Sequence, residues 1–115
     1  MAKQPKAGFS GSFKAPLGPY QVQVMHAIET LAEEAYGGRI EAHLVELGFK
    51  SNRGEVYGAT ARMAERGFLS ERTLPSPLRG GRYTVTVYAL TNTGREALAV
   101  SQRMYSGTHF VAPKK

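Results

Sequence analysis

Residues 51–69 read SNRGEVYGATARMAERGFL and residues 83–91 read YTVTVYALT, and these two stretches decide the fold. In the first, Val56, Thr60 and Met63 recur at spacings of four and three, which places them on one side of an α-helix. In the second, side chains of different character alternate along the chain, which predicts a β-strand. A helix with one inward face and a later extended segment are therefore expected.

Both ends of this helix carry recognisable signals. Ser51 and Asn52 are good N-cap residues, and Glu55 follows Asn52 at the spacing of a capping box. Gly67 is suited to terminate the helix because glycine adopts the left-handed conformation without strain. The predicted helix spans residues 52–66.

A hairpin and a final helix are expected next. The segment 68–73 should form a strand that pairs with 83–91, while the intervening LPSPLRGGR at 74–82 is basic, rich in glycine and proline, and unsuited to a ladder. Thr91 is placed to N-cap the last helix. One face of that helix is expected to hold Ala97, Leu98, Ser101, Met104 and Tyr105.

Two helices are expected upstream. An amphipathic pattern over Tyr20–Tyr36 predicts the first, which Gly37-Gly38 should stop, and the segment 40–47 predicts a shorter second helix ended by Gly48. Three helices, a two-stranded hairpin and a C-terminal helix, in that order, make an α+β fold of the winged helix-turn-helix type. We expect it to span 17–106.

The flanking segments differ in composition from this domain. Residues 1–16 lack periodicity and contain Lys3, Lys6 and Lys14, so a flexible basic arm is expected there. Residues 107–115 are expected to be a flexible tail.

Composition narrows the class of protein. The 115 residues suffice for one domain, and 15 Lys+Arg against nine acids give a net charge of +6, which favours a polyanionic partner. There is no cysteine or aspartate and only three histidines, so no cofactor or metal is expected. No nucleophile motif or phosphate-cradling loop indicates an enzyme. No apolar run reaches the ~20 residues of a membrane span, and a cytoplasmic, nucleoid-associated protein without membrane contact is expected.

Two motifs then resemble a known family. The run from Gly54 to Leu69, with Gly-x-Val-Tyr-x-Ala followed by Arg-Met-x-Glu-x-Gly-Phe-Leu, is similar to a pattern of the PadR-like winged-helix transcriptional regulators. The run Tyr-x-Leu-Thr-x-x-Gly at 88–94 resembles that family's junction between the second wing strand and the last helix. The resemblance implies a DNA-binding regulator whose helix 52–66 enters the major groove.

The chain departs from the family pattern at three places. Gly37-Gly38 stands where the family has Gly-Tyr, and Thr60 stands where it commonly has leucine. The long C-terminal helices through which members dimerise have little counterpart after Met104. A homodimer would therefore need the first helix, the last helix or the N-terminal arm as its interface.

The candidate DNA contacts gather on the predicted helix. Asn52 and Arg53, next to Ser51, lie at its N-terminus, where the helix dipole favours a phosphate. Arg62 is expected to project from the outer face toward a base edge or a phosphate, unless a surface ion pair with a glutamate of the same helix occupies it. Gly58 lies on the same face.

That outer face carries little bulk. Gly54, Gly58 and Ala61 would let the helix backbone approach a partner closely, but they would equally permit packing against another helix of the same chain. The aromatic residues Tyr57 and Tyr88 are expected in the core rather than as stacking platforms for bases.

The remaining candidate contacts lie in the wing and the arm. Arg79 and Arg82 flank Gly80-Gly81 and are expected to contact the DNA backbone or minor groove. The three lysines of the arm could follow an adjacent groove. The three histidines have no metal-ligand spacing and are expected at the surface or at caps.

Three functions remain open at this stage. The favoured one is a sequence-specific DNA-binding transcriptional regulator, expected to act as a repressor and as a homodimer on an inverted repeat. The alternative is a protein-interaction module that uses the same scaffold as an adaptor or antagonist of another regulator. A regulator that senses a small-molecule effector would need a pocket between subunits, and nothing in the sequence indicates one.

Overall fold

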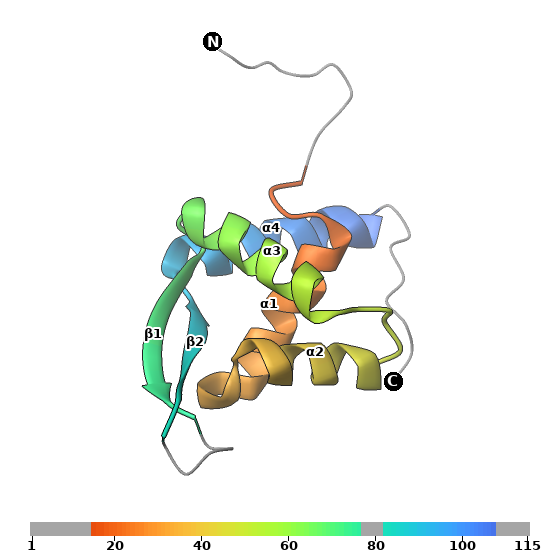
Figure 1. Ribbon diagram of the computed structural model, residues 1–115. Coiled ribbons are helices and arrows are strands. Elements are labelled where there is room, and N and C mark those ends of the chain that lie inside the picture. The colour runs from red at the N-terminus through yellow and green to blue at the C-terminus, as the bar shows by residue number, and fades with distance from the viewer. Residues whose placement is uncertain (1–14, 77–81, 108–115) are drawn as a thin grey trace.

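The computed structural model describes residues 15–76 and 82–107 and has the expected α+β architecture (Figure 1). The elements in chain order are α1 (Pro19–Leu31), the 3-10 turn η1 (Ala32–Glu34), α2 (Gly37–Glu46), α3 (Arg53–Glu65), β1 (Leu69–Pro75), β2 (Thr84–Leu90) and α4 (Asn92–Gly107). Within this part of the chain, no helix is both long and apolar enough to cross a membrane.

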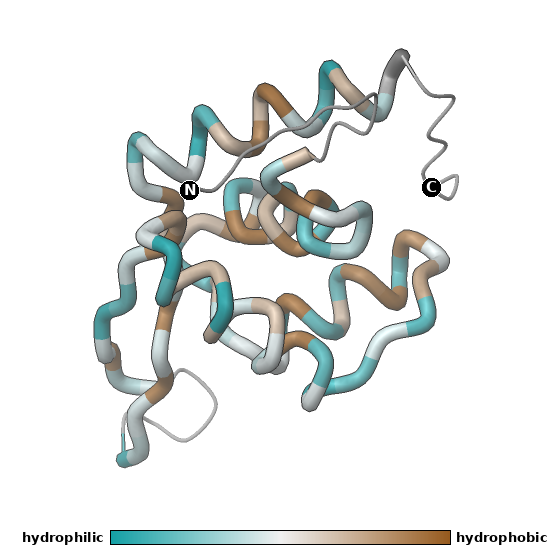
Figure 2. The backbone as a smooth tube through the Cα atoms, turned by 90° about the horizontal axis from the view of Figure 1, so that it is seen from above, coloured by the Kyte–Doolittle hydropathy of each residue, from teal (hydrophilic) through white to brown (hydrophobic). Residues whose placement is uncertain are grey.

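Helix α1 forms the centre of the domain and contacts α2, α3, α4 and β2. Along the helices, apolar and polar residues recur turn by turn (Figure 2), which is the pattern of helices that bury one face. The buried apolar residues form one cluster to which every helix and both strands contribute. Fully burying a leucine- or valine-sized side chain contributes about 1.5–3 kcal/mol.

The expected end of the first helix is wrong. Helix α1 ends at Leu31, and Ala32 follows with a φ of 54°, so the chain turns five residues before the two glycines. Gly37 and Gly38 instead open α2. Gly37 packs closely against α3: a Cβ atom there would lie 2.5 Å from the ring of Tyr57, so that ring would have to shift.

The second and third helices end as expected. Gly48 follows α2 with a φ of 97°, and Gly67 follows α3 with a φ of 82°, both in the region that favours glycine. On α3, Val56, Thr60 and Met63 are buried, as their spacing predicts. The Thr60 hydroxyl donates a hydrogen bond to the backbone oxygen of Tyr57 at 3.1 Å, which satisfies this polar group inside the core.

The antiparallel ladder of β1 and β2 is longer than expected. It continues past Thr73 to the pairs Leu74↔Val85 and Pro75↔Thr84, inside the segment assigned to the loop. A two-stranded sheet leaves one edge of each strand unpaired, so proline can join it without removing a ladder bond. The two strands lie along one side of the helices, at the left in Figure 1, and form the wing.

The junction into α4 locks the wing to the end of α3. Thr91 caps α4 as expected, since its Oγ1 accepts a hydrogen bond from the Gly94 amide at 3.0 Å. The same hydroxyl donates to the backbone oxygen of Gly67 at 2.6 Å. A Cβ atom on Gly94 would lie 2.0 Å from the backbone oxygen of Phe68, so only glycine fits at this position.

Candidate nucleic-acid interface

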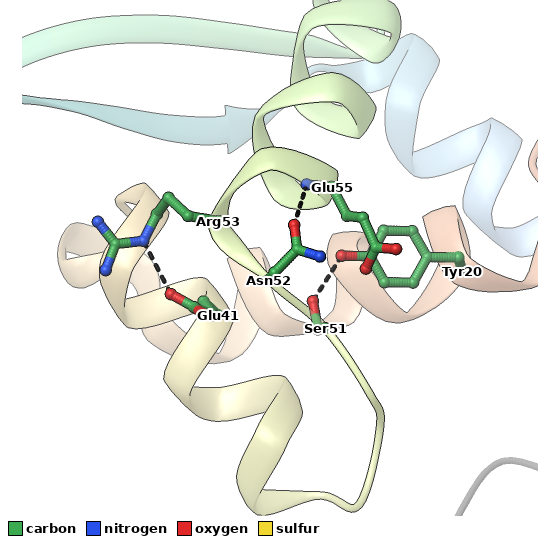
Figure 3. Close-up of polar contacts among 6 residues, drawn as sticks. All are labelled: Tyr20, Glu41, Ser51, Asn52, Arg53 and Glu55. Atoms are coloured by element: carbon green, nitrogen blue, oxygen red, sulfur yellow. Dashed lines mark hydrogen bonds and ion pairs between the residues drawn. The ribbon is translucent and has the colours of Figure 1, made fainter.

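The start of α3 is fixed by two polar contacts (Figure 3). Asn52 is the N-cap, and its Oδ1 accepts a hydrogen bond from the Glu55 amide at 2.9 Å. The hydroxyl groups of Ser51 and Tyr20 lie 2.7 Å apart, which ties the beginning of α3 to α1. Burial raises the pKa of the Tyr20 phenol, although its hydrogen bond to Ser51 acts in the opposite direction. Ser51 therefore anchors the helix, with its hydroxyl turned toward α1.

The outer face of α3 is open. Gly54, Ala61 and Arg62 are exposed, and Gly58 is half-buried. A Cβ atom on Gly54 or Gly58 would have no neighbour within 4 Å except the side chains of Asn52 and Arg62, both from α3 or its cap. The alternative that this face packs against another helix of the chain is therefore wrong for the described residues.

A hollow of about 750 Å³ lies along this face. Its walls come from the start of α1, the connection before α3 and α3 itself, and they include Tyr20, Lys50, Gly58 and Arg62. Lys50 is an exposed cation that the sequence analysis did not single out, although its position two residues before the N-cap of α3 was a usable signal.

Arg62 projects from the exposed side of α3. Its Nη1 donates to the backbone oxygen of Gly58 at 3.3 Å, which directs the side chain along the helix surface. In the described part of the chain, no carboxylate forms an ion pair with it, so the expected alternative of pairing with Glu55 or Glu65 is not observed. Its guanidinium is available to an anionic partner.

Arg53 is held more tightly than its terminal position suggests. Its Nε donates to Oε1 of Glu41 on α2 at 2.8 Å (Figure 3). This hydrogen bond, together with one to Tyr57, raises the pKa of Arg53 further above its ordinary value. Like any arginine, the group is charged throughout the physiological pH range. The side chain still exposes 54% of its surface.

A second hollow, of about 440 Å³, lies between α3 and the wing. Arg53 and Tyr57 line it from α3, Gly38 lines it from α2, and the hydroxyl-bearing Thr84 and Thr86 line it from β2. Helix α3 and the wing thus share a concave surface that carries a cation and several hydrogen-bonding groups.

The expectation that both tyrosines belong to the core holds for one of them. Tyr88 is buried between β2 and the helices, whereas Tyr57 exposes 49% of its surface. Its ring rests against Gly37 at the start of α2 rather than entering the cluster. Tyr57 becomes a residue of the candidate interface that the sequence analysis assigned elsewhere.

The structure describes only part of the expected wing and arm contacts. Arg82 is exposed two residues before β2 begins. Arg79 and the arm residues Lys3, Lys6 and Lys14 lie outside the described residues. On β1, Arg72 adds an exposed cation, 3.8 Å from Glu33, that the sequence analysis did not single out.

The histidines and acidic side chains of the described residues do not form a metal site. His26 is half-buried and contacts Gln102 of α4, so it lies partly at the surface and partly against the last helix. His109 lies outside the described residues. No group of three or more histidine, cysteine or acidic side chains in residues 15–76 and 82–107 could hold a metal ion.

Comparison with known proteins identifies a family that this chain matches. The model of the transcriptional regulator PadR-like family matches residues 24–100, which is more than half of the chain. No curated protein matches.

Several solved structures share the fold. A transcriptional regulator from Thermoplasma acidophilum is 19% identical, with a TM-score of 0.62 over 76% of this chain and 84% of that chain. A PadR family transcriptional regulator from Eggerthella lenta is 19% identical, with a TM-score of 0.63 over 78% and 77%. RosR, solved in a complex, is 28% identical, with a TM-score of 0.53 over 84% and 76%.

Proposed function

The chain belongs to the PadR-like family of transcriptional regulators, and from this we propose that it is a sequence-specific repressor that binds duplex DNA as a homodimer. DNA-binding transcriptional regulation is the function of the family, whereas repression, the dimer and the docking of α3 are the finer parts of the proposal. In it, α3 enters the major groove and the wing lies on the backbone or the minor groove.

The main support for this docking is that the outer face of α3 is exposed, whereas its inner face is buried in the core. Gly54, Gly58 and Ala61 leave the helix backbone accessible at three successive positions of this face. A recognition helix reads base edges only if it approaches them closely, and small side chains permit that approach. Arg62 supplies a cation with free N–H donors at the same surface.

The charge distribution supports the same docking. Lys50 and Arg53 lie at the N-terminal end of α3, Arg62 lies near its C-terminal end, and Arg82 lies on the wing. Phosphate contacts of this kind fix the register of a protein on DNA, while base contacts specify the sequence. Arg79 and the lysines of the arm remain proposed contacts beyond the described residues.

The homodimer is proposed because a two-fold symmetric protein matches an inverted-repeat site, and not because an exposed apolar patch marks an interface. A two-fold dimer would present two copies of α3 to the half-sites of an inverted repeat. Among the described residues, the exposed large apolar side chains are Val45, Tyr57 and Tyr83, and none of them lies on α1 or α4. The mass in solution, with and without duplex DNA, tests this part. A 1:1 complex on a symmetric site would refute it.

Selection of bound sequences from a random duplex library tests the function itself. The wild-type chain is expected to enrich an inverted repeat, and Arg62→Ala is expected to relax the preference at one base position in each half-site. Bidentate arginine–guanine contacts discriminate by about 1–3 kcal/mol, so the relaxed position should lose roughly tenfold or more of its selectivity. A library that shows no enrichment with the wild-type chain would defeat sequence-specific binding.

A second function is favoured by one specific observation. Glu55 and Glu65 are exposed on the open side of α3, where they reduce its attraction to DNA. A protein partner with a complementary basic groove would use the same face, as in an adaptor or antagonist of another regulator. A monomer that shifts no mixed-sequence duplex even at low salt would support this function over the repressor.

A further inference from the structure

The ion pair between Glu41 and Arg53 joins two helices at the edge of the candidate interface. Glu41 is the fifth residue of α2, and Arg53 is the first residue of α3. The Nε–Oε1 distance of 2.8 Å is that of a charge-assisted hydrogen bond. The side chain of Glu41 exposes 27% of its surface, half as much as that of Arg53.

The guanidinium of Arg53 lies over Gly38, the second residue of α2. A Cβ atom added to Gly38 would be in ordinary van der Waals contact with it, 3.5 Å from both Cζ and Nη2. Nε donates to Glu41 and a further hydrogen bond goes to Tyr57, which still leaves N–H donors of the terminal Nη groups for other partners. Arg53 lines the hollow between α3 and β2, where Thr84 and Thr86 add hydroxyl groups.

We infer that Glu41 is a positioning residue for Arg53. It holds the side chain so that the Nη groups donate hydrogen bonds to one backbone phosphate of DNA, which lies between the recognition helix α3 and the wing. The inference rests on the proposed function. It assigns Arg53 to the phosphate backbone rather than to a base edge. It also gives a role in DNA binding to a carboxylate, a group that by charge alone repels the ligand.

Whether removal of Glu41 weakens or strengthens DNA binding distinguishes a positioning role from a purely electrostatic one. By charge alone, removal of a carboxylate near a polyanion strengthens binding. If Glu41 positions Arg53, its removal frees a long side chain that must then lose rotamer freedom when DNA binds. Ordering one such side chain corresponds to about a two- to tenfold loss of affinity.

Four variants of the full chain test this by fluorescence anisotropy on a labelled mixed-sequence duplex across a salt series. Glu41→Ala is expected to weaken binding about two- to tenfold, and Arg53→Ala to weaken it and reduce the salt slope by about 0.9. Glu41→Gln is expected to restore binding relative to Glu41→Ala, because the amide oxygen still accepts from Nε. In the Arg53→Ala background, Glu41→Ala should no longer weaken binding.

Glu46→Ala is the matched control, because it removes the same charge from the exposed C-terminal end of α2. It is expected to leave binding unchanged or to strengthen it slightly. Thermal unfolding of each variant checks that the domain is intact.

Two results would overturn the inference, and they differ in what else they affect. Tighter binding by Glu41→Ala, with Arg53→Ala still weakening binding, would refute positioning alone and leave the proposed function in place. An unchanged affinity and salt slope for Arg53→Ala would refute both positioning and the contact assigned to Arg53. If the wild-type chain itself binds no duplex in these experiments, the proposed function is refuted instead.

Discussion

Replacing Gly58 with alanine should move the stability of the fold and its DNA affinity in opposite directions. Gly58 lies inside α3, and its new Cβ atom would contact only Nη1 of Arg62, at an ordinary 3.7 Å. Glycine in a helix interior costs about 0.8–1.0 kcal/mol relative to alanine. Since no clash offsets this gain, the free energy of unfolding of the variant should be about 1 kcal/mol higher than that of the wild-type chain. This difference corresponds to a thermal unfolding midpoint about 4–8 °C higher.

The same methyl group should weaken DNA binding. It would stand on the open face of α3, at the closest approach to the base edges in the proposed complex. Thermal unfolding followed by circular dichroism measures the first effect, and anisotropy on the selected duplex measures the second. A lower unfolding midpoint would show that the face is covered in the folded chain, and an unchanged affinity would show that Gly58 does not approach DNA.

Three further variants test separate parts of the structure. Gly94→Ala should destabilise the domain by about 3 kcal/mol or more, because its Cβ atom would overlap the backbone oxygen of Phe68; unfolding at the wild-type midpoint would refute the close approach. Asn52→Ala should cost about 1 kcal/mol through loss of the N-cap bond, again read from the unfolding midpoint, and an unchanged midpoint would deny the cap a role. Arg82→Ala should reduce the salt slope of binding to mixed-sequence duplex by about 0.9, and an unaltered slope would remove Arg82 from the interface.

The order of elements was predictable because local signals set it. The spacing of Val56, Thr60 and Met63 defines the buried side of α3 whatever the helix packs against. Asn52 and Thr91 cap the helices that their positions predict. These features depend on neighbours within a few residues, which the sequence displays directly.

The errors come from contacts between distant segments. Gly37 looks like a helix stop in the sequence, yet it is the first residue of α2 and lies against the ring of Tyr57, twenty positions later. Tyr57 itself is 49% exposed beside Gly37, a placement that helical spacing alone does not reveal. The partner of Arg53 is Glu41 on another helix, whereas a helical wheel offers only partners on α3.

Mapping of backbone amide shifts in an isotope-labelled chain, titrated with the selected duplex, tests most directly whether α3 and the wing face DNA. The largest changes are expected at Gly54, Gly58 and Ala61 on the open face of α3 and along the paired strands β1 and β2, with α4 little affected. Changes that cluster on α4 and leave the three small residues of α3 unmoved would contradict the proposed docking.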